Sequence, residues 1–344
     1  MILDEIAAKT RERVARCKEN VSPEEMKKKA LSLPSETGFP FEKQLKKDGV
    51  SFICEIKKAS PSKGVIAEHF PYLDIAAEYE KIGADCISVL TEPDYFMGST
   101  EYLKEIHEKV DVPLLRKDFT VDEYMIYEAK VIGASAVLLI CSLLNEETLR
   151  EWITLSHSLG LSALVEAHDE EEIQMAVRAG ARIIGVNNRN LKTFEVDINN
   201  CIRQRKHIPS DILFVAESGI KSREDVAALE KGGVDGVLRF VTADHITAVG
   251  IAVFTDGFEN RIDRLIQIVF DCDRLKTMIQ HFLISDMIVQ ALNQFVLLFL
   301  QSPFFGNVHA ETEQECLARL RRERYLVSVA DDLRTANRRQ DLDK

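Results

Sequence analysis

The sequence predicts an α/β protein, a (β/α)8 barrel with an N-terminal helical extension, and two observations lead to that prediction. From Phe52 onward, short apolar runs alternate with amphipathic segments, and the ends of successive runs lie about 21 to 33 residues apart, as repeated βα units require. A glycine also recurs before every second run, between a helix and a strand. Eight strands with a four-fold internal repeat favour a closed barrel over an open doubly wound sheet.

The apolar runs predict eight strands, at residues 52–57, 85–90, 112–117, 135–140, 162–166, 182–187, 212–217 and 234–238. The recurring glycines are Gly83, Gly133, Gly180 and Gly233. Each suits the position just after a helix, where a left-handed backbone costs glycine little. No G-x-G-x-x-G motif follows an early strand, which argues against a dinucleotide-binding fold.

Two helices are expected before the first strand, over residues 2–20 and 23–33. The second begins with Ser22 as its N-cap and Pro23 in its first turn, followed by two glutamates. Because both helices precede the first strand, we expect them to form an added cap on the barrel.

Composition and charge exclude several classes of function. The 344 residues are 46% hydrophobic and 29% charged, which is typical of a globular protein, and the net charge of -12 argues against general nucleic-acid binding. Seven cysteines without a C-x-x-C pair predict neither a disulfide framework nor a zinc site and indicate a reducing cytoplasm. The start of the chain lacks the pattern of a secretion signal, and the longest apolar stretch, 287–300, is too short to span a membrane.

Polar residues gather at the ends of five predicted strands, where the active site of this fold lies. Residues two apart in a strand share a face, so Glu55 and Lys57 should point the same way. Any one of these residues could be a solvated loop charge or half of a surface ion pair, but five such strand ends together predict a site. The set is Glu55 and Lys57; Arg116, Lys117 and Asp118; Glu166; Asn187, Asn188 and Arg189; and Glu217, Ser218 and Gly219.

These residue types suit acid–base chemistry on a phosphorylated compound. Lysines at a barrel mouth bind anions or act as general acids, because burial and neighbouring cations depress their pKa. Nearby carboxylates can move protons and orient the lysines. The small Ser/Gly turns after the first and seventh strands offer backbone N–H groups to a phosphate.

Six motifs stand in order along the predicted strands: Cys-Glu-Ile-Lys-Lys-Ala-Ser-Pro-Ser-Lys-Gly (54–64), Ser-Val-Leu-Thr-Glu-Pro-Asp-Tyr-Phe-Met-Gly-Ser (88–99), Leu-Leu-Arg-Lys-Asp-Phe (114–119), Leu-Val-Glu-Ala-His (164–168), Gly-Val-Asn-Asn-Arg-Asn-Leu (185–191) and Ala-Glu-Ser-Gly-Ile (216–220). With the helical extension, they resemble the indole-3-glycerol phosphate synthase family over about residues 1–238. The resemblance implies a TIM-barrel lyase of tryptophan biosynthesis that closes the indole ring of 1-(2-carboxyphenylamino)-1-deoxyribulose 5-phosphate, losing carbon dioxide and water.

The resemblance implies no metal or organic cofactor. The expected partner is a small phosphorylated substrate, with no nucleic acid and no membrane, and we expect a monomer in the cytoplasm.

The resemblance also implies roles for the catalytic residues. Lys117 corresponds to the general acid that protonates the ribulose carbonyl, and Glu166 to the carboxylate that handles the proton during closure and dehydration. Lys57 can hold the substrate carboxylate, and it can also take part in proton transfer, so the division of work between the two lysines stays open. Glu55 would set the protonation and orientation of the lysine, and Asn187 would face the developing hydroxyl.

The same resemblance implies a substrate-binding set. Ser60 and Gly219 correspond to parts of the phosphate site, and Arg189 supports the network around the reacting groups. Glu217 and Ser218 would line the pocket.

The chain departs from the family after residue 238. A Gly-Glu-Ser or Gly-Glu-Thr turn and a final helix should follow the eighth strand, but the sequence continues with Arg239-Phe240 and no glycine. Residues 239–344 lack βα periodicity, and we expect this tail to be partly helical or disordered. We interpret the break as a shifted reading frame or a fusion, with a genuine second domain as the alternative. Either way the eighth βα unit is incomplete, and one wall of the phosphate site should be lost.

Two other functions fit parts of the pattern. Another phosphate-binding barrel, such as phosphoribosylanthranilate isomerase, is the first, but it would not need both Lys57 and Lys117. The second is a catalytically impaired barrel that serves as a binding or scaffold protein through its tail.

Overall fold

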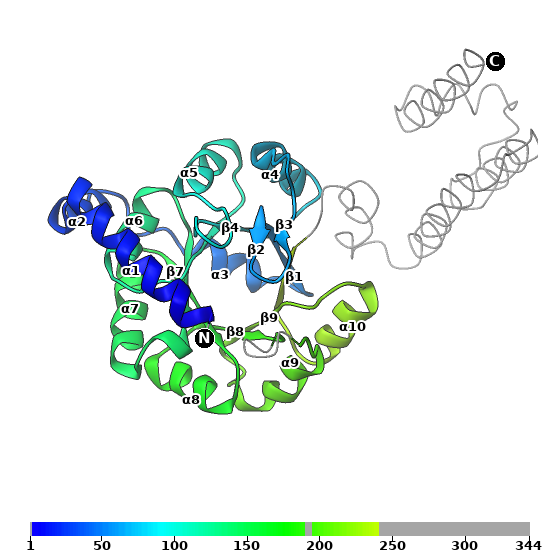
Figure 1. The fold of residues 1–344 in the computed structure, drawn as a ribbon. Coiled ribbons are helices and arrows are strands. Elements are labelled where there is room, and N and C mark those ends of the chain that lie inside the picture. The colour runs from blue at the N-terminus through cyan, green and yellow to red at the C-terminus, as the bar shows by residue number, and fades with distance from the viewer. Residues whose placement is uncertain (1, 190–194, 241–344) are drawn as a thin grey trace, which may run out of the picture. The chain divides into compact units, whose positions relative to one another are not determined.

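The computed structural model describes residues 2–189 and 195–240, and in this part of the chain eight parallel strands close into a barrel (Figure 1). The first strand, β1, pairs with β4 on one side and with β10 on the other, which closes the sheet. The predicted fold is therefore confirmed. The barrel strands are β1 (Ser51–Ile56), β4 (Cys86–Leu90), β5 (Leu114–Lys117), β6 (Ala136–Ile140), β7 (Ser162–Ala167), β8 (Ile183–Asn187), β9 (Leu213–Glu217) and β10 (Gly236–Phe240).

Helices surround the barrel, and α1 lies over the face that holds the carboxyl ends of the strands (Figure 1). Between the strands lie α4 (Tyr72–Lys81), α5 (Thr100–Lys109), α6 (Tyr124–Val131), α7 (Glu146–Ser158), α8 (Glu170–Ala179), α9 (Asn199–Gln204) and α10 (Arg223–Lys231), with the short 3₁₀ turns η1 (Cys141–Leu143) and η2 (Arg205–His207). Before β1 lie α1 (Ile2–Asn20), α2 (Pro23–Leu31) and α3 (Pro40–Leu45). The predicted N-cap Ser22 accepts a hydrogen bond from the backbone of Glu25.

The repeated glycines occupy the conformation that the sequence predicts. Gly83, Gly133, Gly180 and Gly233 have φ angles of 85°, 90°, 89° and 77°, in the left-handed region. Each ends one helix and turns the chain toward the next strand, so the four-fold repeat is a repeat of helix endings.

Two layers of apolar side chains hold the barrel together. An inner cluster fills the barrel, and α3 supplies Phe41 and Leu45 to it, which closes the end opposite the carboxyl ends of the strands. A second, larger cluster packs the helices on the outside. Because strand residues alternate between the two layers, the inner face of β1 continues from Ile53 in the core to Glu55 and Lys57 at the mouth.

Some bounds differ from the prediction. Helix α2 ends at Leu31 rather than at residue 33, and neither α3 nor the hairpin of β2 (Ala59–Ser60) and β3 (Gly64–Val65) was predicted. These elements are too short to show a periodic pattern.

The eighth strand differs in a way that matters for the site. β10 covers residues 236–240, not 234–238, so Arg239 and Phe240 are strand residues that pair with Cys54 and Glu55. The prediction that they occupy the turn after the strand was wrong, because pairing with β1 continues to Phe240. The predicted tail from residue 241 lies outside the described residues.

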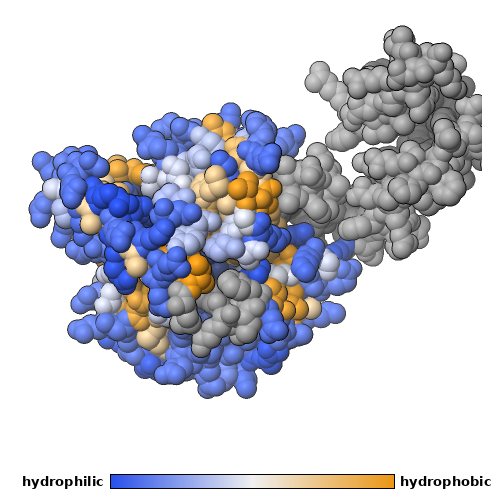
Figure 2. Space-filling view, viewed as in Figure 1, coloured by the Kyte–Doolittle hydropathy of each residue, from blue (hydrophilic) through white to orange (hydrophobic). Residues whose placement is uncertain are grey.

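The face of the molecule around the barrel mouth differs in character from the outer helices. Figure 2 shows hydrophobic side chains gathered around the mouth, whereas the rim of surrounding helices is mostly hydrophilic. Within residues 2–189 and 195–240, no helix has the length and apolar character needed to cross a bilayer.

Candidate active site

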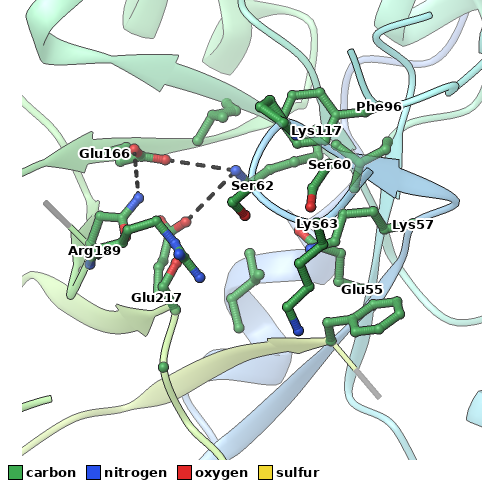
Figure 3. Close-up of a pocket in the computed structure, with 18 of the residues that line it drawn as sticks. Glu55, Lys57, Ser60, Ser62, Lys63, Phe96, Lys117, Glu166, Arg189 and Glu217 are labelled. Atoms are coloured by element: carbon green, nitrogen blue, oxygen red, sulfur yellow. Dashed lines mark hydrogen bonds and ion pairs between the residues drawn. The ribbon is translucent and has the colours of Figure 1, made fainter. Parts of the chain in front are cut away.

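A cavity of about 510 Å³ lies at the carboxyl ends of the barrel strands, as the fold predicts (Figure 3). Residues Ile2, Leu3 and Ile6 of α1 form part of its apolar wall. All ten residues that the sequence singles out for catalysis or substrate binding line it: Glu55, Lys57, Ser60, Lys117, Glu166, Asn187, Arg189, Glu217, Ser218 and Gly219.

Lys117 stands between two carboxylates at the centre of the cavity. Its Nζ lies 3.7 Å from Glu166 Oε2 and 3.9 Å from Glu217 Oε2, and Figure 3 shows both carboxylates converging on it. Burial disfavours the charged amine, but Glu166, Glu217 and Glu55 together outweigh burial and raise the pKa of Lys117 to about 12. The lysine is therefore protonated at neutral pH, and its pKa is raised, not depressed as expected for a lysine at the barrel mouth.

Glu166 is held by three neighbours. Asn187 Nδ2 donates a hydrogen bond of 3.1 Å to Oε1, and His168 Nε2 lies 3.3 Å from the same oxygen. Burial alone would raise the pKa of Glu166, but the charges of Lys117 and His168 and the bond from Asn187 hold it well below its ordinary value. Glu166 is thus a carboxylate at neutral pH.

Glu217 behaves in the opposite way although it faces the same lysine. Its side chain is buried, and its Oε1 has no hydrogen-bond partner among the described residues. Burial first, and then the negative charge of Glu166, raise its pKa. Two carboxyl groups around one ammonium therefore have unequal proton affinity, which is the arrangement that separates acid and base roles.

Gly185 makes room for Glu217. A Cβ atom at position 185 would lie 2.1 Å from Glu217 Oε1, so any side chain there would displace the carboxyl. Gly185 is the first residue of the motif at 185–191, and a glycine is needed there because the Glu217 carboxyl comes so close to the backbone inside the barrel.

Lys57 is paired with Glu55, as the strand alternation predicts. Its Nζ forms a partly buried ion pair with Glu55 Oε1 and lies 4.9 Å from the centre of the Phe240 ring. A carboxylate and the face of an aromatic ring are both attractive to an ammonium. Lys57 is thus held at the mouth by partners from β1 and β10.

Small residues and one lysine form another side of the cavity. Ser218 and Gly219 have φ angles of 67° and 81°, and a Cβ atom on Gly219 would lie 2.2 Å from Val196. From the hairpin of β2 and β3, Ser60 and Lys63 also line the cavity. Sequence reasoning assigned no role to Lys63, although the motif at 54–64 contains it.

Three polar residues at the strand ends serve the framework. Arg116 pairs with Glu128 of α6 at 2.7 Å, and Asn188 donates to the Ser218 carbonyl and accepts from the Cys201 N–H. Asp118 binds both the guanidinium of Arg13, at 2.8 and 2.9 Å, and the Thr91 hydroxyl. Strand alternation turns Arg116 outward while its neighbour Lys117 points inward.

A loop residue that sequence reasoning missed shapes one wall. Glu92 is buried and accepts backbone N–H bonds from Asp94, Tyr95 and Phe96, at 2.9, 2.7 and 3.0 Å. This holds the loop so that Phe96 lines the cavity 5.9 Å from the Phe119 ring, centroid to centroid. Sequence reasoning also missed His168. Glu92 lies in the motif at 88–99 and His168 in the motif at 164–168, and in each case the available signal was a polar residue just after a strand.

The fold and the cavity define a (β/α)8-barrel enzyme with a buried lysine–carboxylate cluster at its catalytic mouth. Comparison with known proteins identifies which one: the model of the family "Indole-3-glycerol phosphate synthase" matches residues 3–239, and the chain belongs to that family. Members of this family are carboxy-lyases of tryptophan biosynthesis.

Curated relatives agree. The chain is 58% identical over 238 residues to the indole-3-glycerol phosphate synthase of Ruminiclostridium cellulolyticum and 53% identical over 238 residues to that of Endomicrobium trichonymphae; each match covers 69% of this chain and 92% of the relative. The enzyme of the same name from Leuconostoc mesenteroides is 51% identical over 255 residues, covering 72% of this chain and 97% of the relative.

Proposed function

We propose that the cavity closes the indole ring of 1-(2-carboxyphenylamino)-1-deoxyribulose 5-phosphate, with loss of carbon dioxide and water. The observation that carries this proposal is the position of the Lys117 ammonium between Glu166 and Glu217, with Lys57 at the same mouth. Ring closure needs a proton donor at the ribulose carbonyl and a proton acceptor for the later loss of water, and this cluster offers both.

Substrate binding follows from the walls of the cavity. Lys57 would exchange its ion pair with Glu55 for one with the benzoate carboxylate. The apolar side chains of α1 and Phe96 would cover the aromatic ring, and this excludes water from the reacting carbons. Ser60 and Gly219 would receive the phosphate, and Lys63 and Arg189, which also line the cavity, would supply positive charge.

The chemical steps use the central cluster. Lys117 protonates the ribulose carbonyl oxygen as the aromatic carbon attacks, which forms the new carbon–carbon bond and a hydroxyl group. Loss of carbon dioxide then returns the bonding electrons to the ring. The hydroxyl then takes a proton from an ammonium at the mouth and leaves as water, while Glu166 accepts the proton that the adjacent carbon loses; Asn187 holds that carboxylate through its 3.1 Å hydrogen bond. Glu55, Glu217 and Ser218 would adjust the charge and shape around these groups.

The alternatives are weaker. An isomerase of a related phosphorylated sugar would not need a second lysine at the mouth, whereas Lys57 and Lys117 both line this cavity. A scaffold protein would not need a partly buried lysine between two buried carboxylates, since such a cluster costs desolvation energy without supporting the fold.

We also propose that the enzymatic domain, expected over residues 1–238, runs to the end of β10 at Phe240, and that the rest of the tail expected over 239–344 does not belong to the family. Cysteine usage favours a location in the cytoplasm, and we expect a monomer. The five cysteines in the described part of the chain are free thiols.

The experiment is a direct assay of the purified full-length chain. Formation of indole-3-glycerol phosphate, with one carbon dioxide released per product molecule, would support the proposal. Substrate turnover to a ring-open isomer without carbon dioxide would favour the isomerase, and saturable substrate binding without turnover would favour the impaired barrel.

A further inference from the structure

His168 does not line the cavity, yet it lies between two carboxylates, one of which does. It follows the last residue of β7, and its ring reaches Glu166 with Nε2 and Glu172 with Nδ1. The cavity residues do not explain why a histidine stands here, but its contacts join Glu166 to the start of α8.

The start of α8 holds the imidazole rigidly. Glu172 Oε2 accepts both the backbone N–H of His168, at 2.8 Å, and the ring Nδ1, at 2.9 Å. Glu172 is held in turn, because its own N–H donates to the side chain of Asp169, the N-cap of α8. Asp169 at the N-cap and Glu172 in the first turn thus each accept a backbone N–H at the start of α8, and Glu172 Oε2 accepts the ring Nδ1 as well.

The contacts also decide the protonation of the ring. Because Nδ1 meets a carboxylate, it must carry a proton. Nε2 then faces the second carboxylate, that of Glu166, at 3.3 Å without the geometry of a straight hydrogen bond. A neutral ring would place a lone pair against that negative oxygen, whereas a charged ring makes the contact attractive.

We propose that His168 is a positioning residue: as an imidazolium anchored by Glu172, it holds the Glu166 carboxylate in place and keeps it ionised for the proton transfers of the cavity. The inference rests on the proposed function, because Glu166 is the group through which His168 acts.

The surrounding charges agree with this reading. Glu166 of β7 and Glu172 of α8 face the ring, Asp169 at the N-cap of α8 accepts the Glu172 N–H, and Lys117 of β5 lies beyond Glu166. The Cys141 thiol of η1 stays neutral, because burial raises its pKa. Burial disfavours the charged imidazole, but its two carboxylate partners outweigh burial and raise the pKa of His168 to about 10.

The first test needs no activity. The ring nitrogens of His168 in the full-length protein are titrated by nuclear magnetic resonance, and we expect a midpoint at least about two pH units above the ordinary histidine value of 6.5. Glu172→Gln should lower that midpoint. A wild-type midpoint near 6.5 overturns the proposal whether or not the enzyme turns over.

The second test is kinetic and uses His168→Gln, which keeps an N–H donor but removes the charge. We expect kcat to fall about tenfold with KM little changed. Without the neighbouring cation the pKa of Glu166 rises, so the acidic limb of the kcat–pH profile should move up by about one pH unit.

His207→Gln is the matched control. His207 Nδ1, in η2, lies 3.2 Å from Glu170 of α8, the helix that also carries Glu172. Neither His207 nor Glu170 lines the cavity, so this variant should match wild type. A His168→Gln enzyme with wild-type kcat and pH profile overturns the positioning role, provided that Glu166→Gln impairs turnover. If Glu166→Gln is also fully active, the proposed function of the cluster fails instead, and the titration alone decides the state of His168.

Discussion

The ammonium of Lys57 lies 4.9 Å from the centre of the Phe240 ring, and this contact joins the first barrel strand to the last. Phe240 pairs with Glu55 across the β1–β10 edge, so its side chain lies on the same face as the site residues. A glycine turn was expected after the eighth strand in this family. The aromatic ring therefore stands close to where the phosphate cradle should begin.

We predict that this ending weakens binding of the phosphorylated substrate. Backbone N–H groups approach a phosphate closely only where no side chain obstructs them. Replacing residues 239–344 with a Gly-Glu-Ser turn and a terminal helix should lower KM at least about tenfold, or roughly 1.4 kcal/mol of binding. Calorimetric titration of inorganic phosphate into both proteins is the measurement. Equal affinities would show that the tail supplies phosphate contacts of its own.

Removing the central ammonium should abolish most of the turnover. Lys117→Met keeps the length and apolar stem of the side chain but has no proton to give, so kcat should fall about 10²-fold or more. Circular dichroism checks that the barrel remains folded, and Lys104→Met, at an exposed lysine of α5, is the control that should retain activity. Near-normal turnover in Lys117→Met would remove this residue from the mechanism.

Carboxylate recognition can be separated from phosphate recognition at Lys57. In wild type, the substrate should bind more tightly than an analogue without the benzoate carboxylate. Lys57→Ala should lose that preference and bind the analogue as wild type does, because in substrate binding the ammonium contacts only the carboxylate. The affinities are compared by competition with product. A variant that still discriminates between the two ligands would show that another group binds the carboxylate.

The raised pKa of Glu217 predicts a pH dependence of stability. A carboxyl whose pKa is higher in the folded than in the unfolded protein binds a proton more tightly when folded. Its contribution therefore becomes more favourable as pH falls from the raised pKa toward the ordinary value of 4.5, and is lost as pH rises again.

Glu217→Gln, which cannot titrate, should remove this component. The wild-type melting temperature should accordingly gain more than that of the variant between pH 8 and pH 5, a range that lies between the raised pKa of about 8 and the ordinary value of 4.5. Thermal unfolding across this range measures it, and parallel curves for the two proteins would contradict the assignment.

Gly185 provides a steric test of the cluster. Gly185→Ala places a methyl group where Glu217 Oε1 now lies, at 2.1 Å, so the carboxyl must move and the charge around Lys117 must change. We expect a loss of about 1 to 3 kcal/mol in stability, as for other overpacked cores, together with reduced kcat. Gly232→Ala is the control, because Gly232 has a φ of -76°, which any residue adopts, and a Cβ atom added there would lie no closer than 3.1 Å to its neighbours. Comparable effects of both changes would argue against a specific role for the space at 185.

Much of the site was predictable because barrel geometry converts order along the chain into nearness in space. Glu55, Lys117, Glu166 and Glu217 come from four strands, and parallel strands bring their carboxyl ends to one mouth. The motifs indicated which residues belong to the site, and the alternation of side chains along each strand indicated which of them point into the barrel. The same alternation also predicts that Arg116, next to the inward-facing Lys117, points away from the cavity, and it pairs with Glu128 of α6.

By itself the sequence determined the βα repeat, the helix endings at its four glycines and the residues that meet at the mouth, since these follow from local periodicity and backbone preference. The tertiary structure alone decided that Glu166 and Glu217 differ in proton affinity, that His168 reaches Glu166, and that Phe240 covers Lys57. Those relationships depend on burial and on contacts between distant segments. Electrostatic energies of this kind change steeply over a few ångströms, and only the packed barrel sets distances on that scale.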